Sequence, residues 1–430
     1  MALPARAVAA KTLQRVLSGQ SLNQLLPSAL DAANPADRPL CRELIYGALR
    51  EWPLLDARCD ALLARPMRSK EHDIKALICC GLYELSHMRT PAHAAVSECV
   101  NATRALKKPW ATALVNRVLR DYQRLGQDAP SPPDAAAQHA LPLWMWQTLL
   151  EEYGDRAVAI AEASRQRPPM TLRVNSGRVS RADYLVLLSE ANIEAEPCAF
   201  APAGIRLQRG VDVQALPQFE AGWVSVQDEA AQATAGVLAL QPGEHVLDAC
   251  AAPGGKACLL AEQQPGLAEL VACDVSSERL GKVADNIRRL GVPVRCETAD
   301  ARALPEHLLA SGFDAILADV PCSATGVMRR NPDIKILRQH EDIAGFAEQQ
   351  LAILKGLWPA VKPGGRLLYV TCSVLKAEND DVIEAFLAQG GATCEPLSLP
   401  TGLSRQFGWQ CLPTPDGGDG LYFSLLRKPA

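Results

Sequence analysis

The chain has 430 residues, 48% of them hydrophobic, which is enough to build packed cores in two or three domains. Its formal net charge of −4 offers nucleic acid no overall attraction, yet residues 1–140 hold 18 Lys and Arg against 13 Asp and Glu. A mildly basic N-terminal module on an acidic body is compatible with an RNA partner. No apolar run approaches the roughly 20 residues that span a membrane, and the first residues lack the long apolar stretch of a secretory signal. We therefore expect a cytoplasmic protein without a membrane partner.

The 14 cysteines are expected to be free thiols, because the cytosol is a reducing compartment. None of them forms a C-x-x-C pair, and the only close pair is Cys79 and Cys80. The usual spacing of a zinc knuckle is therefore missing, and we expect no metal site. Most of these cysteines should be small buried side chains.

Residues 1–126 are predicted to form an all-helical bundle. Apolar residues recur there at positions i, i+3, i+4 and i+7 in two stretches: Cys41, Leu44, Ile45 and Ala48, and Ala111, Leu114, Val115 and Val118. Turn signals such as Asn34-Pro35 and Thr90-Pro91 separate the periodic stretches. Residues 127–142 are rich in Pro and Ala and only weakly periodic, so we interpret them as a linker.

Residues 143–228 alternate between helical and extended patterns and are interpreted as a small α+β subdomain. Helical patterns cover Trp144–Ser164 and Arg181–Ala191, whereas strand patterns cover Thr171–Asn175 and Ile205–Leu207. The pattern alone assigns this subdomain no function.

Residues 229–430 show a regular alternation of strands and helices. Apolar runs lie at His245–Ala249, Leu270–Cys273, Val294–Glu297, Ala315–Ala318 and Arg366–Val370, with helix-length stretches between them. Strands that alternate with helices predict an α/β domain with a mostly parallel, Rossmann-like sheet. Two further runs follow, Ala392–Glu395 and Leu421–Leu426, and the second comes after turn-forming residues 416–420. We expect this second run to form an antiparallel edge strand.

The first of these strands runs into a loop of small residues, after which a helix is predicted. In an open α/β sheet, ligands bind beyond the carboxyl ends of the strands, and adjacent glycines let the backbone and the helix N-terminus approach a ligand. The phosphate-binding patterns G-x-x-x-x-G-K-[ST] and G-x-G-x-x-G both fail here, so a pyrophosphate ligand is disfavoured. The candidate cofactor residues of this loop are Cys250, Ala251, Ala252, Pro253, Gly254, Gly255 and Lys256.

Two carboxylates follow at the next strand ends. Asp274 ends the second strand, where it can accept hydrogen bonds from both ribose hydroxyls of a nucleoside, and Asp300 follows the third, placed to contact an adenine amino group. Either residue alone could equally be a helix N-cap. Both together, behind a glycine loop, favour a nucleoside ligand without phosphates, which suggests S-adenosylmethionine.

Two thiols stand at the ends of the fourth and fifth strands. Cys322 follows Asp319 in the first case, and Cys372 ends the second. In the strand order 3-2-1-4-5 these strands are neighbours, so the thiols should lie side by side near the methyl donor. A buried structural cysteine is the alternative for each. A thiolate that adds to C6 of a cytosine makes C5 nucleophilic toward a sulfonium methyl group, a second group manages release, and Asp319 can assist protonation at N3.

Together these motifs resemble the RNA cytosine-C5 methyltransferases of the bacterial 16S ribosomal RNA type, the RsmB (Sun/Fmu) family. The matching segments are VQDE at 226–229, DACAAPGGK at 248–256, Asp274, Asp300, DVPCSATG at 319–326, RRNP at 329–332 and TCS at 371–373. In the N-terminal region, AHAAVSECV at 92–100 and ALVNRVLR at 113–120 resemble a NusB-type RNA-binding module.

This resemblance implies that Cys372 is the nucleophile and Cys322 the release cysteine. It also implies that residues 250–256, Asp274, Asp300 and Asp319 contact S-adenosylmethionine. The expected reaction is methyl transfer to C5 of one cytosine in 16S ribosomal RNA that is not yet assembled into the subunit. The expected domains are a NusB-like RNA-binding domain at 1–126 and a catalytic domain at 229–430, in a monomer.

Two alternatives remain open at this point. A DNA cytosine-C5 methyltransferase would use the Pro-Cys motif, with Cys322 as the nucleophile, but the Thr-Cys pair and the helical module argue against it. A non-catalytic NusB-like RNA-binding factor would carry an inactive transferase domain. The intact glycine loop and the presence of both thiols argue against such decay.

Overall fold

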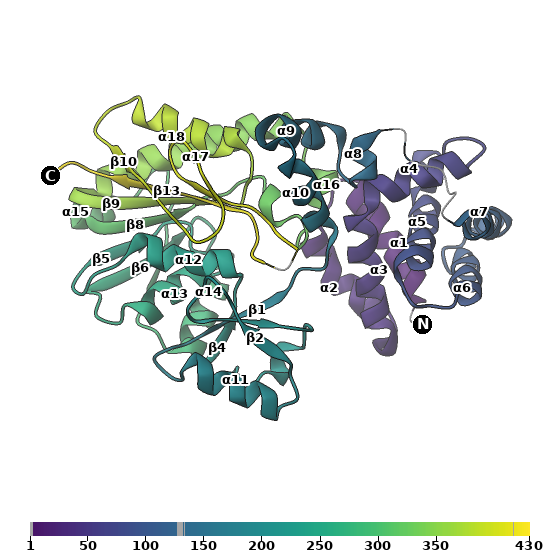
Figure 1. The fold of residues 1–430 in the computed structure, drawn as a ribbon, viewed down its shortest axis with the longest axis horizontal. Coiled ribbons are helices and arrows are strands. Elements are labelled where there is room, and N and C mark those ends of the chain that lie inside the picture. Colours follow the sequence, from purple (N-terminus) through teal and green to yellow (C-terminus); the bar gives the residue numbers. More distant parts are fainter. Residues whose placement is uncertain (1–2, 127–131, 133, 416) are drawn as a thin grey trace. The chain divides into compact units, whose positions relative to one another are not determined.

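The computed structural model describes residues 3–126, 132, 134–415 and 417–430. The chain divides into two compact units (Figure 1). One contains the N-terminal region up to Arg167 together with Met328–His340, and the other contains Pro168–Val327 and Glu341–Ala430. Within the described ranges, no helix combines the length and the apolar character needed to cross a membrane.

The first unit is helical, as its periodicity predicts. Its helices are α1 (Ala5–Leu17), α2 (Leu22–Ala32), α3 (Arg38–Arg50), α4 (Trp52–Leu62), α5 (His72–His87), α6 (Ala92–Ala105), α7 (Thr112–Leu125), α8 (Ala135–Gln138), α9 (Leu143–Tyr153), α10 (Arg156–Arg165) and α16 (Ile334–Leu337). Helix α5 forms the centre of the bundle, because it contacts α1, α3, α4, α6 and α7. The apolar positions predicted on α3 are completely buried: Cys41, Leu44, Ile45 and Ala48.

Two details of this unit differ from the sequence-based expectation. The helix expected over Trp144–Ser164 is interrupted at Gly154, which has φ +54° and separates α9 from α10. The expected linker contains a short helix, α8, which buries Ala136 and Ala137 and is capped by the Asp134 side chain. Residues 127–131 and 133 of the expected linker lie outside the described part of the chain.

The segment Met328–His340 belongs to the helical unit although it lies between two strands of the other unit in sequence. The Asp333 side chain accepts a hydrogen bond from the backbone N–H of Leu22 at 2.9 Å. Lys335 donates to the carbonyl of Arg50 at 2.8 Å, and the Arg50 guanidinium donates to the carbonyl of Arg329 at 2.9 Å. Burial lowers the pKa of Lys335 to about 7. This inserted segment is therefore a buried part of the bundle, which local periodicity did not predict.

The second unit begins with a small antiparallel sheet in the order β2-β3-β1-β4. Its elements are β1 (Met170–Val174), α11 (Arg181–Glu190), β2 (Ala195–Pro197), β3 (Gly204–Leu207) and β4 (Val224–Val226). The elements β1, α11 and β3 match the predicted runs. The strands β2 and β4 were not predicted, because three residues are too few to show a period.

The main sheet has the order β11-β12-β13-β9-β8-β5-β6-β7, and β10 pairs with β13. Its strands are β5 (His245–Asp248), β6 (Glu269–Asp274), β7 (Arg295–Thr298), β8 (Phe313–Asp319), β9 (Val361–Thr371), β10 (Thr393–Glu395), β11 (Leu403–Ser404), β12 (Trp409–Cys411) and β13 (Leu421–Arg427). The five strands from β7 to β9 are parallel, whereas β13 is antiparallel to β9. The predicted order 3-2-1-4-5 and the antiparallel pairing of the strand after it are confirmed, but β13 is not the edge of the sheet, because β12 and β10 pair with it on the side away from β9. Of the predicted turn at 416–420, Asp416 lies outside the described residues.

Helices cover both faces of this sheet (Figure 1). One face packs against α15 (Glu306–Ser311), α17 (Asp342–Leu357) and α18 (Asp380–Leu387). The other packs against α12 (Glu229–Leu238) and α13 (Gly255–Gln263), with α14 (Ser277–Leu290) beside α13. Because both faces are covered, the central parallel strands β6 and β8 are buried and largely apolar, as expected for parallel strands, whereas β7 at the edge is polar and mostly exposed.

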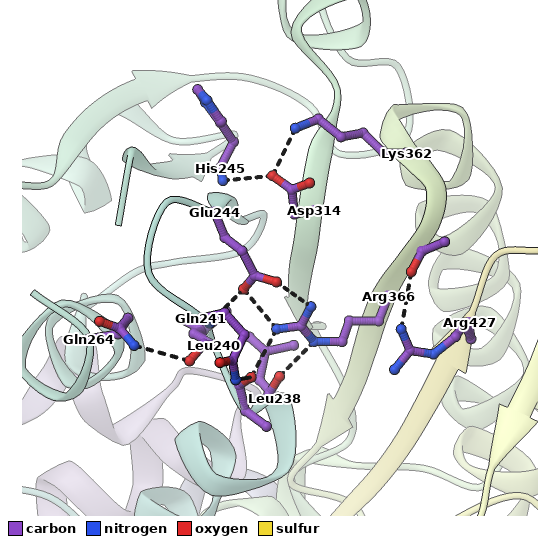
Figure 2. Close-up of polar contacts among 12 residues, drawn as sticks. Leu238, Leu240, Gln241, Glu244, His245, Gln264, Asp314, Lys362, Arg366 and Arg427 are labelled. Carbon is purple, nitrogen blue, oxygen red and sulfur yellow. Dashed lines mark hydrogen bonds and ion pairs between the residues drawn. The ribbon is translucent and has the colours of Figure 1, made fainter. Parts of the chain in front are cut away.

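A polar network joins the amino ends of three strands (Figure 2). The buried Arg366 on β9 donates to both carboxylate oxygens of Glu244 at 2.7 and 2.8 Å, and to a backbone carbonyl at the end of α12. Asp314 on β8 accepts from the Lys362 ammonium at 2.8 Å and from the backbone N–H of His245 at 2.9 Å. These bonds fix β5, β8 and β9 at the end opposite the predicted site.

Candidate active site

The loops at the carboxyl ends of the parallel strands enclose a cavity of about 270 Å³. That volume is close to the lower end of small-molecule pockets, which span roughly 300–1,000 Å³. The predicted site residues that line it are Cys250, Ala252, Asp274, Asp300, Asp319, Cys322 and Cys372. The other predicted loop residues are not part of its wall: Ala251, Pro253, Gly254, Gly255 and Lys256.

Gly254 shapes the loop that follows β5. It is the N-cap of α13, and its φ of +100° lies in the left-handed region. A Cβ atom here would lie 3.0 Å from Cγ1 and 3.1 Å from Cα of Val283 on α14, so a larger residue would push loop and helix apart. The N–H of Ala251 donates to the carbonyl of Cys273 on β6 at 2.8 Å. These contacts hold the backbone of the loop at the cavity.

Asp274 ends β6 and is only 3% exposed. Its carboxylate accepts hydrogen bonds from the backbone N–H groups of Ala252 at 3.3 Å and Ser276 at 3.0 Å. It also lies 3.5 Å from a guanidinium nitrogen of Arg279. The N-cap of α14 is Ser276, not Asp274, so the simple capping interpretation does not apply. Asp274 is a fixed carboxylate in the cavity wall.

Asp300 follows β7 and lines the same cavity. Its carboxylate pairs with the guanidinium of Arg302 at 2.7 Å and accepts the Arg302 backbone N–H at 2.9 Å. The hydrogen bond from Arg302 holds the pKa of Asp300 below its usual range. The next helix, α15, starts only at Glu306, so Asp300 is not its N-cap. Asp300 is therefore an ionised acceptor at neutral pH.

Asp248, the last residue of β5, was not predicted as a site residue. It is completely buried beside the cavity wall formed by Ala249 and Cys250, and neither carboxylate oxygen has a hydrogen-bond partner among the described residues. Burial, followed by the charge of Asp319, raises the pKa of Asp248 to about 8. The carboxylates that the cavity wall does present are those of Asp274 and Asp300, which suit a ligand with hydroxyl and amino donors. S-adenosylmethionine carries two ribose hydroxyls and an adenine amino group, which match these acceptors.

Lys256 and Asp319 form an ion pair at 2.6 Å between the glycine loop and the end of β8. Burial opposes the charge of Lys256, but the neighbouring acidic groups, Asp319 foremost, together outweigh this effect and raise the pKa of Lys256. Lys256 therefore remains a cation at neutral pH. The pair holds the Asp319 carboxylate at the cavity wall.

The two predicted thiols are in contact. The Sγ atoms of Cys322 and Cys372 lie 3.2 Å apart, and both residues line the cavity. Cys322 is buried and Cys372 is half-buried. The hydrogen bond with Cys372, then burial, and more weakly the charge of Glu378, raise the pKa of the Cys322 thiol well above its usual value. Cys322 is therefore protonated at neutral pH.

Arg173 on β1 is a supporting residue that the sequence analysis missed. It is 2% exposed and pairs with Glu262 on α13 at 2.9 Å. It also donates to the carbonyl of Gly255 at 2.8 Å and to the Gln227 side chain at 2.5 Å. The small sheet thereby supports the helix start behind the glycine loop. A charged residue in the middle of a buried strand was the one signal that could have identified it.

Comparisons with known proteins match all parts of this architecture. Residues 235–427 match the 16S rRNA methyltransferase RsmB/F family, residues 141–214 match its ferredoxin-like domain, and residues 3–124 match the NusB family. The ribosomal RNA small subunit methyltransferase B of Pseudomonas syringae pv. tomato is 45% identical over 435 residues, covering 99% of this chain and 97% of the relative.

Two solved structures share the fold. The crystal structure of PH0851 is 22% identical with a TM-score of 0.81 and covers 100% of both chains. A methyltransferase homologue from Pyrococcus horikoshii is 26% identical with a TM-score of 0.58 and covers 72% of this chain and 98% of its own. The sheet order, the glycine loop and these neighbours define the second unit as a Rossmann-like methyltransferase.

More specifically, the chain belongs to the RsmB/F family of 16S ribosomal RNA methyltransferases, with a NusB-like helical region at its N-terminus. This confirms the family inferred from the sequence motifs. As a member of this family, the chain is a small-subunit ribosomal RNA methyltransferase.

Proposed function

We propose that this protein transfers a methyl group from S-adenosylmethionine to C5 of a cytosine in 16S ribosomal RNA, through a covalent bond between Cys372 and C6. The observation that carries the proposal is the contact of two thiols, 3.2 Å apart, on a cavity that also presents Asp274, Asp300 and Asp319. One thiol can bond to the base while the second remains next to it.

The cofactor would lie along the carboxyl ends of β5 to β7. Asp274 would accept hydrogen bonds from the two ribose hydroxyls, and Asp300 would accept one from the adenine amino group. Bound there, S-adenosylmethionine supplies an electrophilic methyl group. The buried, nearly dry setting of Asp274 strengthens its contacts.

Cys372 would attack as the thiolate, with its sulfur bonding to C6 of the base. As the C6–S bond forms, N3 of the ring takes a proton from solvent. Asp319, fixed by Lys256, would accept a hydrogen bond from this N3–H and so stabilise the protonated ring, and N3 returns the proton to solvent after release. Electron density then moves to C5, which takes the methyl group. Cys322 is buried and its hydrogen bond with Cys372 raises its pKa, which supports this division of roles, because a protonated, buried thiol is a poor nucleophile.

Release needs a base for the proton on C5. Once Cys372 is a thioether, it no longer accepts the Cys322 hydrogen bond as a thiolate and carries no charge, so the main cause of the raised pKa of Cys322 disappears. Cys322 can then lose its proton to solvent and take the proton from C5. The C5–C6 double bond re-forms as the C6–S bond breaks, which returns Cys372 as a thiolate beside a protonated Cys322.

The test compares 16S ribosomal RNA from cells without the gene and from the same cells carrying wild-type protein or Cys372→Ala. Bisulfite sequencing should show one protected cytosine only with the wild type. Purified protein, given RNA and DNA of the same sequence, should methylate the RNA. Methylation of the DNA, or a ribosomal RNA methyl group on another atom, would contradict the proposal.

A further inference from the structure

The contact between the two thiols needs a support beyond the strand ladder. The pairing of β8 with β9 ends at Asp319 opposite Val370. Cys322 lies three residues beyond that point and Cys372 two residues beyond it. The spacing of the two sulfurs is therefore set by the loops that carry them, and a loop outside a ladder is free to move unless other bonds fix it.

A single buried carboxylate bonds to both of these loops. Glu378 is completely buried at the end of the short 3-10 helix Lys376–Glu378, outside the paired parts of β8 and β9. Its Oε1 accepts the backbone N–H of Ser323 at 2.7 Å, and its Oε2 accepts the Ser323 hydroxyl at 2.5 Å. Oε2 also accepts the Ser373 hydroxyl at 2.6 Å. Ser323 and Ser373 are the residues that directly follow the two thiols.

The hydrogen bonds from Glu378 to the Cys322 and Cys372 loops form a clamp, and neighbouring hydrogen bonds extend it. Gln350 on α17 donates to Glu378 at 3.1 Å and to the carbonyl of Pro321 at 3.0 Å, so it fixes the residue before Cys322. The hydroxyl of Thr325 lies 3.1 Å from that of Ser373. All these side chains except the proline are completely buried. Water therefore does not compete for the bonds, and each contributes more than it would at the surface.

The carboxylate is an acceptor for four hydrogen bonds, which is close to its full capacity. Each bond to a charged group contributes more than a bond between neutral groups. Glu378 is not among the described residues that line the cavity. Its effect on chemistry must therefore pass through the two loops.

We propose that Glu378 is a positioning residue that holds the Cys322 and Cys372 loops at the separation that adduct formation and release require. This inference rests on the proposed thiol mechanism, and it assigns the coupling between the two steps to a residue that contacts neither RNA nor cofactor. A carboxylate is suited to the task because one planar group bonds to both loops at once.

The test uses full-length Glu378→Gln and Glu378→Ala, with Glu384→Gln on the exposed side of α18 as the matched control. Ser373→Ala is the milder variant if Glu378→Ala does not fold. One readout does not depend on methyl transfer. Diamide, which is reduced as it takes two electrons and two protons from a pair of thiols, should rapidly join Cys322 to Cys372 in the wild type. Mass spectrometry of the digested protein measures this disulfide.

We expect Glu378→Ala to slow this disulfide by about tenfold or more and to lower kcat by ~10²-fold, since a displacement of about 1 Å at reacting groups has an effect of that size. KM for RNA and the affinity for S-adenosylmethionine should stay close to those of wild type. Glu378→Gln should give an intermediate kcat, because it keeps the oxygen that accepts the Ser323 N–H.

Unchanged disulfide rates in Glu378→Ala and Ser373→Ala would overturn the proposal, and so would equal losses of kcat and cofactor affinity. A clear change in the disulfide rate together with no methylated cytosine in wild-type assays would instead support the clamp and refute the proposed function. The proposed role of Glu378 and the proposed function can therefore be refuted independently.

Discussion

Cys322→Ala should trap RNA on the protein, whereas Cys372→Ala should not. Without the second thiol, Cys372 can still attack and C5 can still take the methyl group, but no base removes the C5 proton. General base catalysis typically contributes about 10²- to 10⁴-fold, which is about 2.7–5.4 kcal/mol at 1.36 kcal/mol per tenfold. Elimination should slow by that factor, so the adduct accumulates.

The competing effect is a loss of stability. Cys322 is 9% exposed, and removing one sulfur from such a position costs about 1 kcal/mol of folding free energy. That loss lowers the amount of folded protein but creates no covalent complex. The size and the nature of the two effects therefore differ enough to be told apart.

The assay is a denaturing gel after incubation with labelled 16S RNA and S-adenosylmethionine. Cys296→Ala, which removes an exposed thiol on β7, is the matched control and should behave as wild type. A shifted band in Cys322→Ala that requires the target cytosine supports the assignment. A shifted band in Cys372→Ala and none in Cys322→Ala would reverse the two roles and favour the mechanism of the DNA enzymes.

Three further predictions test the cofactor site, the buried carboxyl and the RNA-binding unit. Asp274→Ala should weaken S-adenosylmethionine binding by about 10- to 150-fold, since bonds to a charged group contribute about 1.5–3 kcal/mol; calorimetry should show no such change for the exposed Asp285→Ala. Folded protein keeps the Asp248 proton up to about pH 8, whereas the unfolded chain loses it near pH 4, so wild-type stability falls as pH rises across that window. Asp248→Asn should therefore gain stability relative to wild type between about pH 5 and pH 8 in urea unfolding, and parallel profiles would refute the raised pKa. Replacing the exposed Arg104 and Arg117 with Gln should weaken RNA binding and reduce its salt slope by about 0.7 for each phosphate that is no longer neutralised, and an unchanged slope would place the RNA elsewhere.

The sequence predicted the catalytic sheet well because its signals are local. The strands β5, β6 and β8 are apolar runs that end in an aspartate, and the strand order of such sheets follows a general rule. The contact of Cys322 with Cys372 follows from that rule, since their strands are neighbours. Asp274 and Asp300 line the cavity for the same reason.

Residues that act through distant partners could not be predicted. Arg173 is paired with a glutamate 89 positions later, and no local pattern contains both. Glu378 has partners from three parts of the chain, so its role depends on the tertiary fold. The orphaned Asp248 looked like the ordinary start of a loop, because burial on both faces of a sheet is invisible until the helices that cover it are known.

The segment Met328–His340 changes how the helical unit should be tested. It starts six residues after Cys322 in the chain, yet its side chains are bonded within the helical unit through Asp333 and Lys335. Deleting residues 1–140 would remove Leu22 and Arg50, which are the partners of those two side chains. The buried Lys335, whose pKa is lowered by burial, would then lose its partner carbonyl, become exposed and take up a proton. This new charge would lie on a segment that is close in sequence to Cys322. Loss of activity in such a truncation would therefore not measure RNA affinity, and surface substitutions such as those at Arg104 and Arg117 are the cleaner test.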